Sequence, residues 1–185
     1  MRIIRGKYGH RRFKAPASFH ARPTTDFAKE NLFNVLDNLV EWESMDALDL
    51  FSGTGSIAFE MLSRGCRSVT AVETNYKHIS FIEKVAKTLN INELNLIRGD
   101  VLRYLSSVRN VSFGLIFADP PYDFPAMPDL PNLILNSSLL REGGFFILEH
   151  SKNKDFSTLP YFSQRRVYGA VNFSIFVKAK VKKDA

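Results

Sequence analysis

Cysteine and long apolar runs are the two things this sequence most lacks. Cys66 is the only cysteine in 185 residues, so no disulfide can form within the chain. No apolar stretch approaches the roughly 20 residues needed to cross a bilayer. The amino terminus is basic and has no apolar stretch of the kind found in secretory signals. We therefore expect a cytoplasmic protein without a membrane-spanning segment.

Recognisable metal-binding and nucleophile motifs are also missing. The four histidines, His10, His20, His78 and His150, are too scattered to give a ligand spacing with Cys66. We find no serine-nucleophile motif and no pair of carboxylates at hydrolase spacing. The sequence therefore predicts no metal site.

The net positive charge of the protein comes from the two ends of the chain. Residues 1–30 and residues 150–185 each hold eight Lys/Arg against two Asp/Glu, or +6 each. Residues 31–149 hold nine against fifteen, or −6, which recovers the total of +6. Tyr8, Phe13 and Phe19 interleave the amino-terminal charges, as disordered tails seldom show. A folded basic arm that binds a polyphosphate backbone is favoured over a solvated tail.

The length and composition predict one globular domain with a basic extension. We place the extension at residues 1–23, as a β-hairpin built from residues 2–5 and 11–14 around Gly6 and Gly9. The catalytic domain would be residues 24–185, beginning with a helix over residues 27–40 that Thr24, Thr25 or Asp26 caps.

From Asp46 onward, short apolar runs alternate with amphipathic stretches. The expected strands are 47–51, 68–73, 95–98, 114–118 and 144–149, and the expected helices are 56–64, 76–90, one after 100, and 130–140. This alternation predicts a parallel sheet covered by helices on both faces. An antiparallel hairpin of residues 163–168 and 171–178 would close it with a reversed edge strand. Five prolines between 120 and 131 predict one long, functional loop.

A glycine loop follows the first of these strands, in Leu48-Asp49-Leu50-Phe51-Ser52-Gly53-Thr54-Gly55-Ser56. Gly53 and Gly55 permit a tight turn that a ligand can approach closely. Glu73 ends the second strand, where a carboxylate can accept hydrogen bonds from ribose hydroxyls. Asp100, which follows the third strand and precedes Val101, could receive an adenine amino group.

Three acidic groups lie at the ends of successive strands, namely Asp49, Glu73 and Asp100. They would repel a pyrophosphate and attract a cationic ligand. The sulfonium and amino groups of S-adenosylmethionine (SAM) fit this charge. A nicotinamide dinucleotide stays open, because Gly53, Gly55 and Ala58 satisfy the looser G-x-G-x-x-A pattern. A glycine turn that only packs the helix, and a purely helix-capping Asp100, are the structural alternatives. The predicted cofactor residues are Asp49, Phe51, Gly53, Gly55, Glu73, Asp100 and Val101.

Asp119-Pro120-Pro121-Tyr122 directly follows the apolar strand at 114–118 and is the most specific motif. An exocyclic amine on a purine is a poor nucleophile, so a site that methylates it must orient the amine. We predict that the Asp119 side chain and the Pro120 carbonyl, held rigid by the prolines, accept its two N–H bonds. Tyr122 would stack on the base. Phe124 could widen this platform or pack inward.

Together these segments resemble the RsmD-type family of 16S ribosomal RNA guanine-N2 methyltransferases over nearly the whole chain. The likeness rests on Met1 to Ile4, Gly6-Lys7, Arg22 to Asp26, Leu48 to Ser56, Leu62 to Gly65 and Asp119 to Tyr122. It implies a seven-stranded sheet, SAM as donor with S-adenosyl-L-homocysteine as product, and a guanine in a small-subunit RNA loop as substrate. The substrate would be modified in partly assembled particles, and we expect a monomer.

The same resemblance assigns further residues. Glu30 matches the family's glutamate on the first helix, and Arg22 and Thr24 should lie beside cofactor or RNA. Phe27-Ala28-Lys29 stands where members usually have Arg-Val-Arg, which removes two arginines from this helix. Glu149 matches a family acid to which we assign no role. The predicted RNA-binding residues are Arg5, Lys7, Arg11, Arg12, Lys14, Arg22 and Thr24.

Three other functions remain as alternatives. The Asp-Pro-Pro-Tyr motif also occurs in methyltransferases that act on DNA adenine or on a protein amide. DNA modification would normally need an added region to read base edges, and 185 residues leave little room for one. A nicotinamide oxidoreductase and a noncatalytic RNA-binding module of the same fold are the remaining two.

Overall fold

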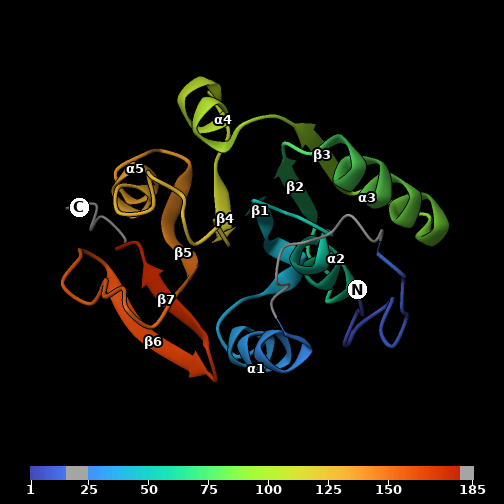
Figure 1. The fold of residues 1–185 in the computed structure, drawn as a ribbon, viewed down its shortest axis with the longest axis horizontal. Coiled ribbons are helices and arrows are strands. Elements are labelled where there is room, and N and C mark those ends of the chain that lie inside the picture. Colours follow the sequence, from blue (N-terminus) through green and yellow to red (C-terminus); the bar gives the residue numbers. More distant parts are fainter. Residues whose placement is uncertain (16–24, 180–185) are drawn as a thin grey trace, which may run out of the picture.

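The computed structural model describes residues 1–15 and 25–179 (Figure 1). One seven-stranded sheet crosses the molecule in the order β3-β2-β1-β4-β5-β7-β6. The strands are β1 (Asp46–Leu50), β2 (Ser68–Glu73), β3 (Leu94–Arg98), β4 (Phe113–Ala118), β5 (Leu140–His150), β6 (Phe162–Tyr168) and β7 (Val171–Val177). The first five run parallel, and β7 pairs antiparallel with both β5 and β6. The predicted α/β sheet with an antiparallel last strand is confirmed.

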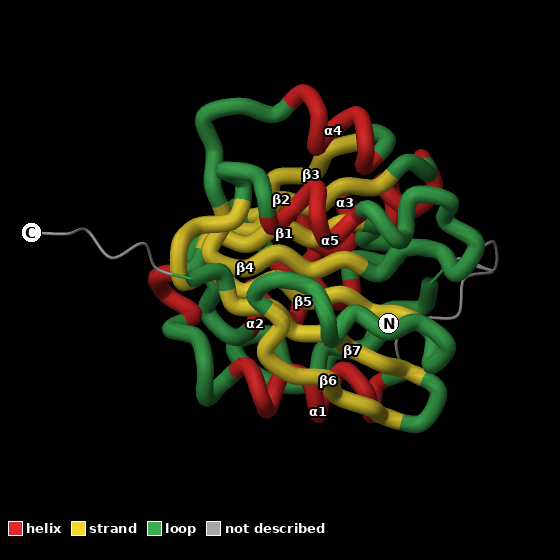
Figure 2. The backbone as a smooth tube through the Cα atoms, turned by 90° about the vertical axis from the view of Figure 1, so that its left-hand side faces the viewer, coloured by secondary structure: helices red, strands yellow, loops and turns green. Residues whose placement is uncertain are grey.

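Helices cover both faces of this sheet (Figures 1 and 2). They are α1 (Asp26–Leu36), α2 (Ser56–Ser63), α3 (Tyr76–Leu89), α4 (Val101–Ser107) and α5 (Leu130–Leu135), with a 3₁₀ turn at Trp42–Ser44. Side chains of β1 alternate between the faces, so Ala47 packs with α1, α2 and α3 while Leu48 packs with α4 and α5. Parallel strands need this double cover because both faces must be removed from water.

Several expected boundaries differ from the observed ones. The first helix ends at Leu36 rather than near residue 40, and Thr25 is its cap, since its hydroxyl accepts from the Ala28 amide at 3.1 Å. Helix α5 stops at Leu135, where the Ser137 hydroxyl donates to the Ile134 carbonyl at 2.8 Å. After residues 136–139, β5 begins at Leu140, four residues earlier than predicted.

Two predictions of topology also need correction. The reversed strand does not lie at the edge, because β7 is inserted between β5 and β6 and the edge strand is β6. The proline-rich segment is not one irregular loop. It is a series of turns closed by backbone bonds such as Phe124 N to Pro121 O at 2.9 Å, and Pro131 belongs to the first turn of α5. Among the described helices, none is long and apolar enough to cross a membrane.

The amino-terminal arm, residues 1–15, folds back on itself and docks on α2. Arg2 and Arg12 form an isolated antiparallel bridge, and the Ile3 amide donates to the Arg11 carbonyl at 3.0 Å. Gly6 has φ +84°, and a Cβ at this position would lie 1.8 Å from the Ser63 carbonyl oxygen. Only glycine fits there, which explains how the arm approaches the helix so closely.

Buried charges beneath the arm fix its position. The Lys29 side chain is fully buried on α1, where its ammonium donates to the Arg2 carbonyl and to the Ser56 hydroxyl at 2.8 Å. Its Nζ lies 3.8 Å from the carboxylate of buried Glu60, which also accepts from the Ile4 amide at 2.7 Å. Burial lowers the pKa of Lys29. Lys29 is therefore internal and cannot contact RNA directly, whereas Phe27 is exposed.

Replacing Lys29 with Met should destabilise the fold by about 3 kcal/mol, because it leaves the Glu60 carboxylate buried without one of its cationic partners. Urea unfolding followed by circular dichroism measures this loss. Lys87→Met, which removes an exposed lysine from α3, is the control and should change stability by less than about 0.5 kcal/mol. Equal stabilities of the two variants would show that the buried pair does not hold the arm.

Candidate active site

A cavity of about 660 Å³ lies where the parallel strands end. This volume is typical of a small-molecule site. Its charged lining is almost wholly acidic, with six carboxyl groups, one histidine and, among the described lining residues, no lysine or arginine. The acidic residues are Asp49, Glu73, Asp100, Asp119, Asp123 and Glu149. The structure thus brings together all four predicted acids, and it adds Asp123 and Glu149.

Glu73 is locked to the glycine loop by backbone hydrogen bonds. One carboxylate oxygen accepts from the Gly53 amide at 2.8 Å, and the other accepts from the Asn75 amide at 2.8 Å. Gly53 has φ +53°, which allows its amide to turn toward β2. The Thr74 hydroxyl makes a third, longer contact at 3.4 Å. A carboxylate has about four acceptor positions, so a ligand with two hydroxyl groups would use the remaining position of Glu73 and replace the Thr74 contact. Gly53 and Glu73, 20 residues apart in the sequence, are thus in direct contact.

Asp49 is buried at the start of α2. Its carboxyl accepts from the Ala58 amide at 3.2 Å, in the first turn of that helix. Burial, opposed by this bond and assisted by the charge of Glu73, raises the pKa of Asp49 to about 7. A buried carboxyl facing a cavity is stabilised in its ionised form when a cation enters. The position favours a positively charged ligand group beside Asp49.

The same hydrogen bonds disfavour a pyrophosphate. Dinucleotide sites offer glycine-loop amides and a helix N-terminus to phosphate oxygens. Here the Gly53 amide is taken by Glu73, the Gly55 amide by the Ser52 carbonyl at 2.7 Å, and the Ala58 amide by Asp49. Two carboxylates and a backbone carbonyl therefore occupy three of the donors that a phosphate would use. The geometry fits the cationic SAM and argues against a nicotinamide dinucleotide.

The predicted glycines have different roles. Gly53 lines the cavity, whereas Gly55 is not among the described lining residues. Gly55 has φ +72°, and a Cβ there would lie 3.0 Å from the Phe59 ring and 3.1 Å from Ile82. It therefore lets α2 pack against α3. Phe51, which has φ +63°, lines the cavity and packs edge-to-face on Phe124 with ring centres 5.0 Å apart.

Asp100 and Val101 follow β3 at the rim of the cavity. One Asp100 oxygen accepts from the Arg103 amide at 2.9 Å and caps α4. The helix-capping alternative is thus observed, yet Asp100 also lines the cavity and has a second oxygen. Val101 is buried against the core on the α4 side of the sheet and lines the cavity beside Asp100.

The turn Asp119 to Tyr122 closes the opposite wall. Its Asp119 amide lies 3.4 Å from the Leu50 carbonyl, so the turn is joined to the end of β1. Asp119 is half-buried, Pro120 is buried, and Tyr122 is 56% exposed. All three line the cavity, as does Phe124, which packs inward on Phe51. The motif and the acidic strand ends therefore share one cavity, as the sequence predicts.

No role is predicted from the sequence for some of the residues that line the cavity. His78 lies in the first turn of α3, with its Nδ1 3.4 Å from a Glu73 oxygen. Its position five residues after a strand-end acid could have indicated it. Thr54 and Ser56 belong to the glycine loop and line the same wall. Glu149 is 4% exposed at the end of β5, where the neighbouring Leu148 pairs with Ala118 of β4. This register places it next to the Asp119 turn.

The predicted RNA-binding residues that the structure describes lie on the arm, apart from the cavity. Arg5 is exposed, with a guanidinium nitrogen 3.9 Å from Asp37, and the cationic groups of Lys7 and Arg11 lie over the Tyr8 ring at 5.1 and 5.9 Å. Arg12 and Lys14 line a second hollow, against α3. Arg22 and Thr24 lie outside the described residues. The described arm therefore presents a cationic surface.

Comparisons with known proteins agree over most of the chain. The family model described as "Conserved hypothetical protein 95" matches residues 1–177. "Putative rRNA methyltransferase YlbH" of Bacillus subtilis is 32% identical over 184 residues, covering 96% of this chain and 99% of that protein. Ribosomal RNA small subunit methyltransferase D of Buchnera aphidicola (Baizongia pistaciae) is 31% identical, covering 80% and 75%. The solved structure of hypothetical protein TTHA0928 from Thermus thermophilus superposes with a TM-score of 0.83 at 26% identity, covering 95% and 98%.

The family model extends from the arm through the glycine loop to the Asp119 turn, and the Bacillus subtilis relative matches nearly the whole chain. The chain belongs to the Conserved hypothetical protein 95 family, that of the RsmD-type methyltransferases that its motifs resemble.

Proposed function

We propose that this protein transfers a methyl group from SAM to the exocyclic N2 amine of a guanine in 16S ribosomal RNA. One observation carries the proposal. The Asp119-Pro120-Pro121-Tyr122 turn and the acidic strand ends Asp49, Glu73 and Asp100 line a single cavity. A donor that is cationic and an acceptor that is a planar amine would therefore meet there. The relatives named as ribosomal RNA methyltransferases support the choice of substrate.

Different acidic residues of the cavity would bind different parts of SAM. Glu73, already oriented by two amides, would accept hydrogen bonds from the ribose hydroxyls, and Asp100 would accept one from the adenine amine. Asp49 would lie closest to the positively charged groups. When bound, SAM supplies a methyl group on a sulfonium and is released as S-adenosyl-L-homocysteine.

Asp119 and Pro120 act on the base. Its amine is conjugated with the purine ring, so its nitrogen lone pair must be turned toward the methyl carbon. The Asp119 carboxylate and the Pro120 carbonyl accept the two N–H bonds, and Asp119 holds the proton that leaves when the new N–C bond forms. Tyr122 stacks on the ring. Such positioning lowers a barrier by as much as about 7 to 11 kcal/mol when the geometry of attack is near ideal.

RNA is the substrate that the surface favours. A single-stranded loop lets one base unstack at low cost and enter a pocket of this size. The cationic arm supplies binding to the phosphate backbone that does not depend on sequence. We further propose that the protein acts as a monomer, in the cytoplasm, on partly assembled small subunits.

Nucleoside mass spectrometry of 16S RNA tests the proposal most directly. Cells that lack this protein should lose one N2-methylguanosine, and the purified protein with labelled SAM should restore it on RNA or particles from those cells. Comparing protein-free RNA with particles identifies the true substrate. An unchanged methylguanosine content, together with label entering DNA adenine or a protein amide, would move the activity to that other acceptor.

Affinity for SAM should rise with pH through neutrality. Burial raises the pKa of Asp49 to about 7 in the protein without ligand, and only the ionised carboxyl attracts the cation. Between pH 6 and pH 8 we therefore expect affinity to increase about tenfold, with a proton released on binding at pH 6. Calorimetry in buffers of different ionisation enthalpy counts that proton.

The Asp49→Asn variant should bind SAM more weakly and without this part of the pH dependence. The same linkage acts on folding. A carboxyl whose pKa is raised on folding takes up protons relative to the unfolded chain, so its contribution to stability declines as pH rises from about 4 to about 7. A flat SAM affinity between pH 6 and pH 8 in the wild-type protein would contradict the role of Asp49.

A further inference from the structure

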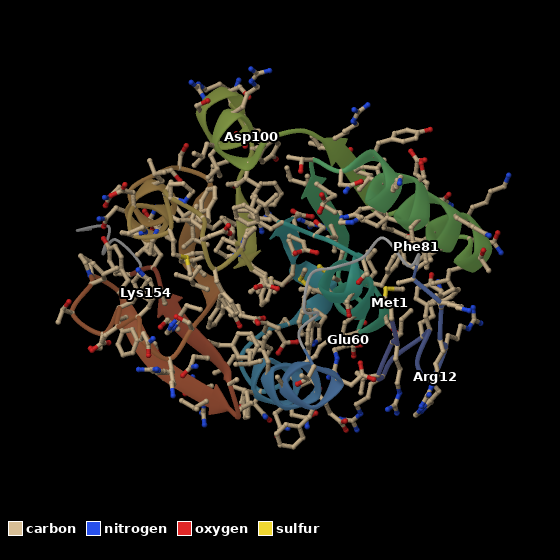
Figure 3. All side chains as sticks on the ribbon, viewed as in Figure 1. Met1, Arg12, Glu60, Phe81, Asp100 and Lys154 are labelled. Atoms are coloured by element: carbon tan, nitrogen blue, oxygen red, sulfur yellow. The ribbon has the colours of Figure 1, made fainter. Side chains whose placement is uncertain are left out.

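A second hollow of about 800 Å³ separates the amino-terminal arm from α3. Residues 12–15 of the arm form one wall, and the face of α3 that carries Lys77, Phe81 and Lys84 forms the other. Figure 3 shows Met1, Arg12 and Phe81 at the same end of the molecule, while Lys154 lies at the opposite end. We call this hollow the arm–α3 groove.

The charge of the groove is opposite to that of the cavity. Arg12, Lys14, Lys77 and Lys84 line it, and none of its described lining residues is acidic. Ser80 and Thr88 add hydroxyl groups on the same helical face. The floor is partly apolar, because Phe13 and Phe81 contribute to it. Four cations around an aromatic floor suit a polyanion with planar bases and repel a cationic ligand.

The start of α3 divides the groove from the cavity. Thr74 and His78 line the cavity, whereas Tyr76 and Lys77, between them in sequence, line the groove. Tyr76 is 64% exposed, and the Arg98 guanidinium lies 5.4 Å from its ring centre. An aromatic ring therefore stands at the border of the two sites, with a cation on one side of it.

We propose that the arm–α3 groove holds the single-stranded RNA next to the target nucleotide. Lys77 and Lys84 contact its phosphates from α3, Arg12 and Lys14 contact them from the arm, and Tyr76 stacks on a base that flanks the one in the cavity. The inference rests on the proposed function, and it adds α3 to the RNA-binding surface that the sequence placed on the arm alone.

The dimensions agree with a short stretch of strand. Lys77 and Lys84 are seven residues apart on one helix, a rise of roughly 10 Å. Stacked nucleotides of one strand follow one another at about 3.4 Å, so the two lysines span roughly three nucleotides. Contacts to phosphates and stacking on Tyr76 would fix the position of the RNA backbone. Recognition of the base itself would then depend on the cavity.

The experiment compares Lys77→Ala/Lys84→Ala with Lys87→Ala, which removes an exposed charge from the same helix outside the groove. Filter binding to protein-free 16S RNA is measured from low to high salt. The double variant should lower the slope of log affinity against log salt by about 1.4, or 0.7 per lost phosphate contact. Its KM for RNA should rise about tenfold, with kcat unchanged at saturation and SAM affinity unaltered. Lys87→Ala should resemble wild type.

Tyr76→Ala tests the stacking contact, with Tyr76→Phe as the variant that keeps the ring. The first should weaken RNA binding about tenfold or more, and the second should not. A wild-type salt slope in the Lys77→Ala/Lys84→Ala variant would overturn the proposal that the arm–α3 groove binds RNA. So would a loss confined to ribosomal particles and absent on protein-free RNA, because the partner would then be a ribosomal protein. The expected losses of RNA binding in these variants, together with a wild-type protein that leaves guanine unmethylated, would instead overturn the proposed function alone.

Discussion

Asp119→Ala should lower kcat for methyl transfer by about a thousandfold, the loss typical of removing one preorganised group at a reaction centre. The reason is geometric, because Asp119 lies in the same cavity as the cofactor acids and is joined to the end of β1. Without its carboxylate the amine has one acceptor fewer and the departing proton loses its base. Affinity for SAM should stay within a few fold, since Asp49, Glu73 and Asp100 are untouched.

Asp129→Ala provides the control for this variant. Asp129 is an exposed carboxylate ten residues along the same segment, and its side chain makes no capping hydrogen bond to α5. The Asp129→Ala variant should therefore transfer methyl groups at the wild-type rate. Single-turnover assays with labelled SAM measure both variants, and calorimetry measures their SAM affinity. Normal turnover by Asp119→Ala would remove it from the reaction, and a lost SAM affinity would reassign it to cofactor binding.

Most of the sheet could be predicted because most of its strands are bounded by turn residues. The strand at Ser68–Glu73 was predicted without error, since its apolar run ends at an acid and Asn75 then caps α3. The α5–β5 boundary was not, because Leu139 and Leu140 continue a helical spacing. Pairing of Leu140 with Phe113 of β4 turns that stretch into strand. Local sequence does not contain this partner.

Part of the candidate site could likewise be predicted from the sequence, and part of it could not. Strand-end acids and the Asp119 turn could be found because parallel strands bring their carboxyl ends to one edge. The bond between Glu73 and the Gly53 amide could not, since it depends on the paths of two loops. Lys29 shows the limit most clearly. A lysine on an amphipathic helix predicts a solvent-facing charge, yet it is buried, because Glu60 and the Arg2 carbonyl surround it.

Glu73→Gln should weaken SAM binding by at least about a hundredfold, the second large effect we expect. A carboxylate that accepts from two ribose hydroxyls contributes roughly 1.5 to 3 kcal/mol through each charge-assisted bond. The amide that replaces it has one oxygen in place of two and directs an NH₂ group at a donor. It also loses one of its bonds to the Gly53 and Asn75 amides, so the glycine loop is less firmly held.

Glu83→Gln serves as the control, because it removes an exposed carboxylate from α3 outside the cavity. Calorimetry should give it wild-type affinity. Thermal unfolding separates loss of contact from loss of fold, since a Glu73 variant that still unfolds cooperatively has kept its sheet. At saturating SAM, its kcat should recover to within a few fold, because Asp119 still orients the base. Unaltered affinity in Glu73→Gln would mean that the donor's ribose lies elsewhere, and that the acidic strand ends hold a different ligand.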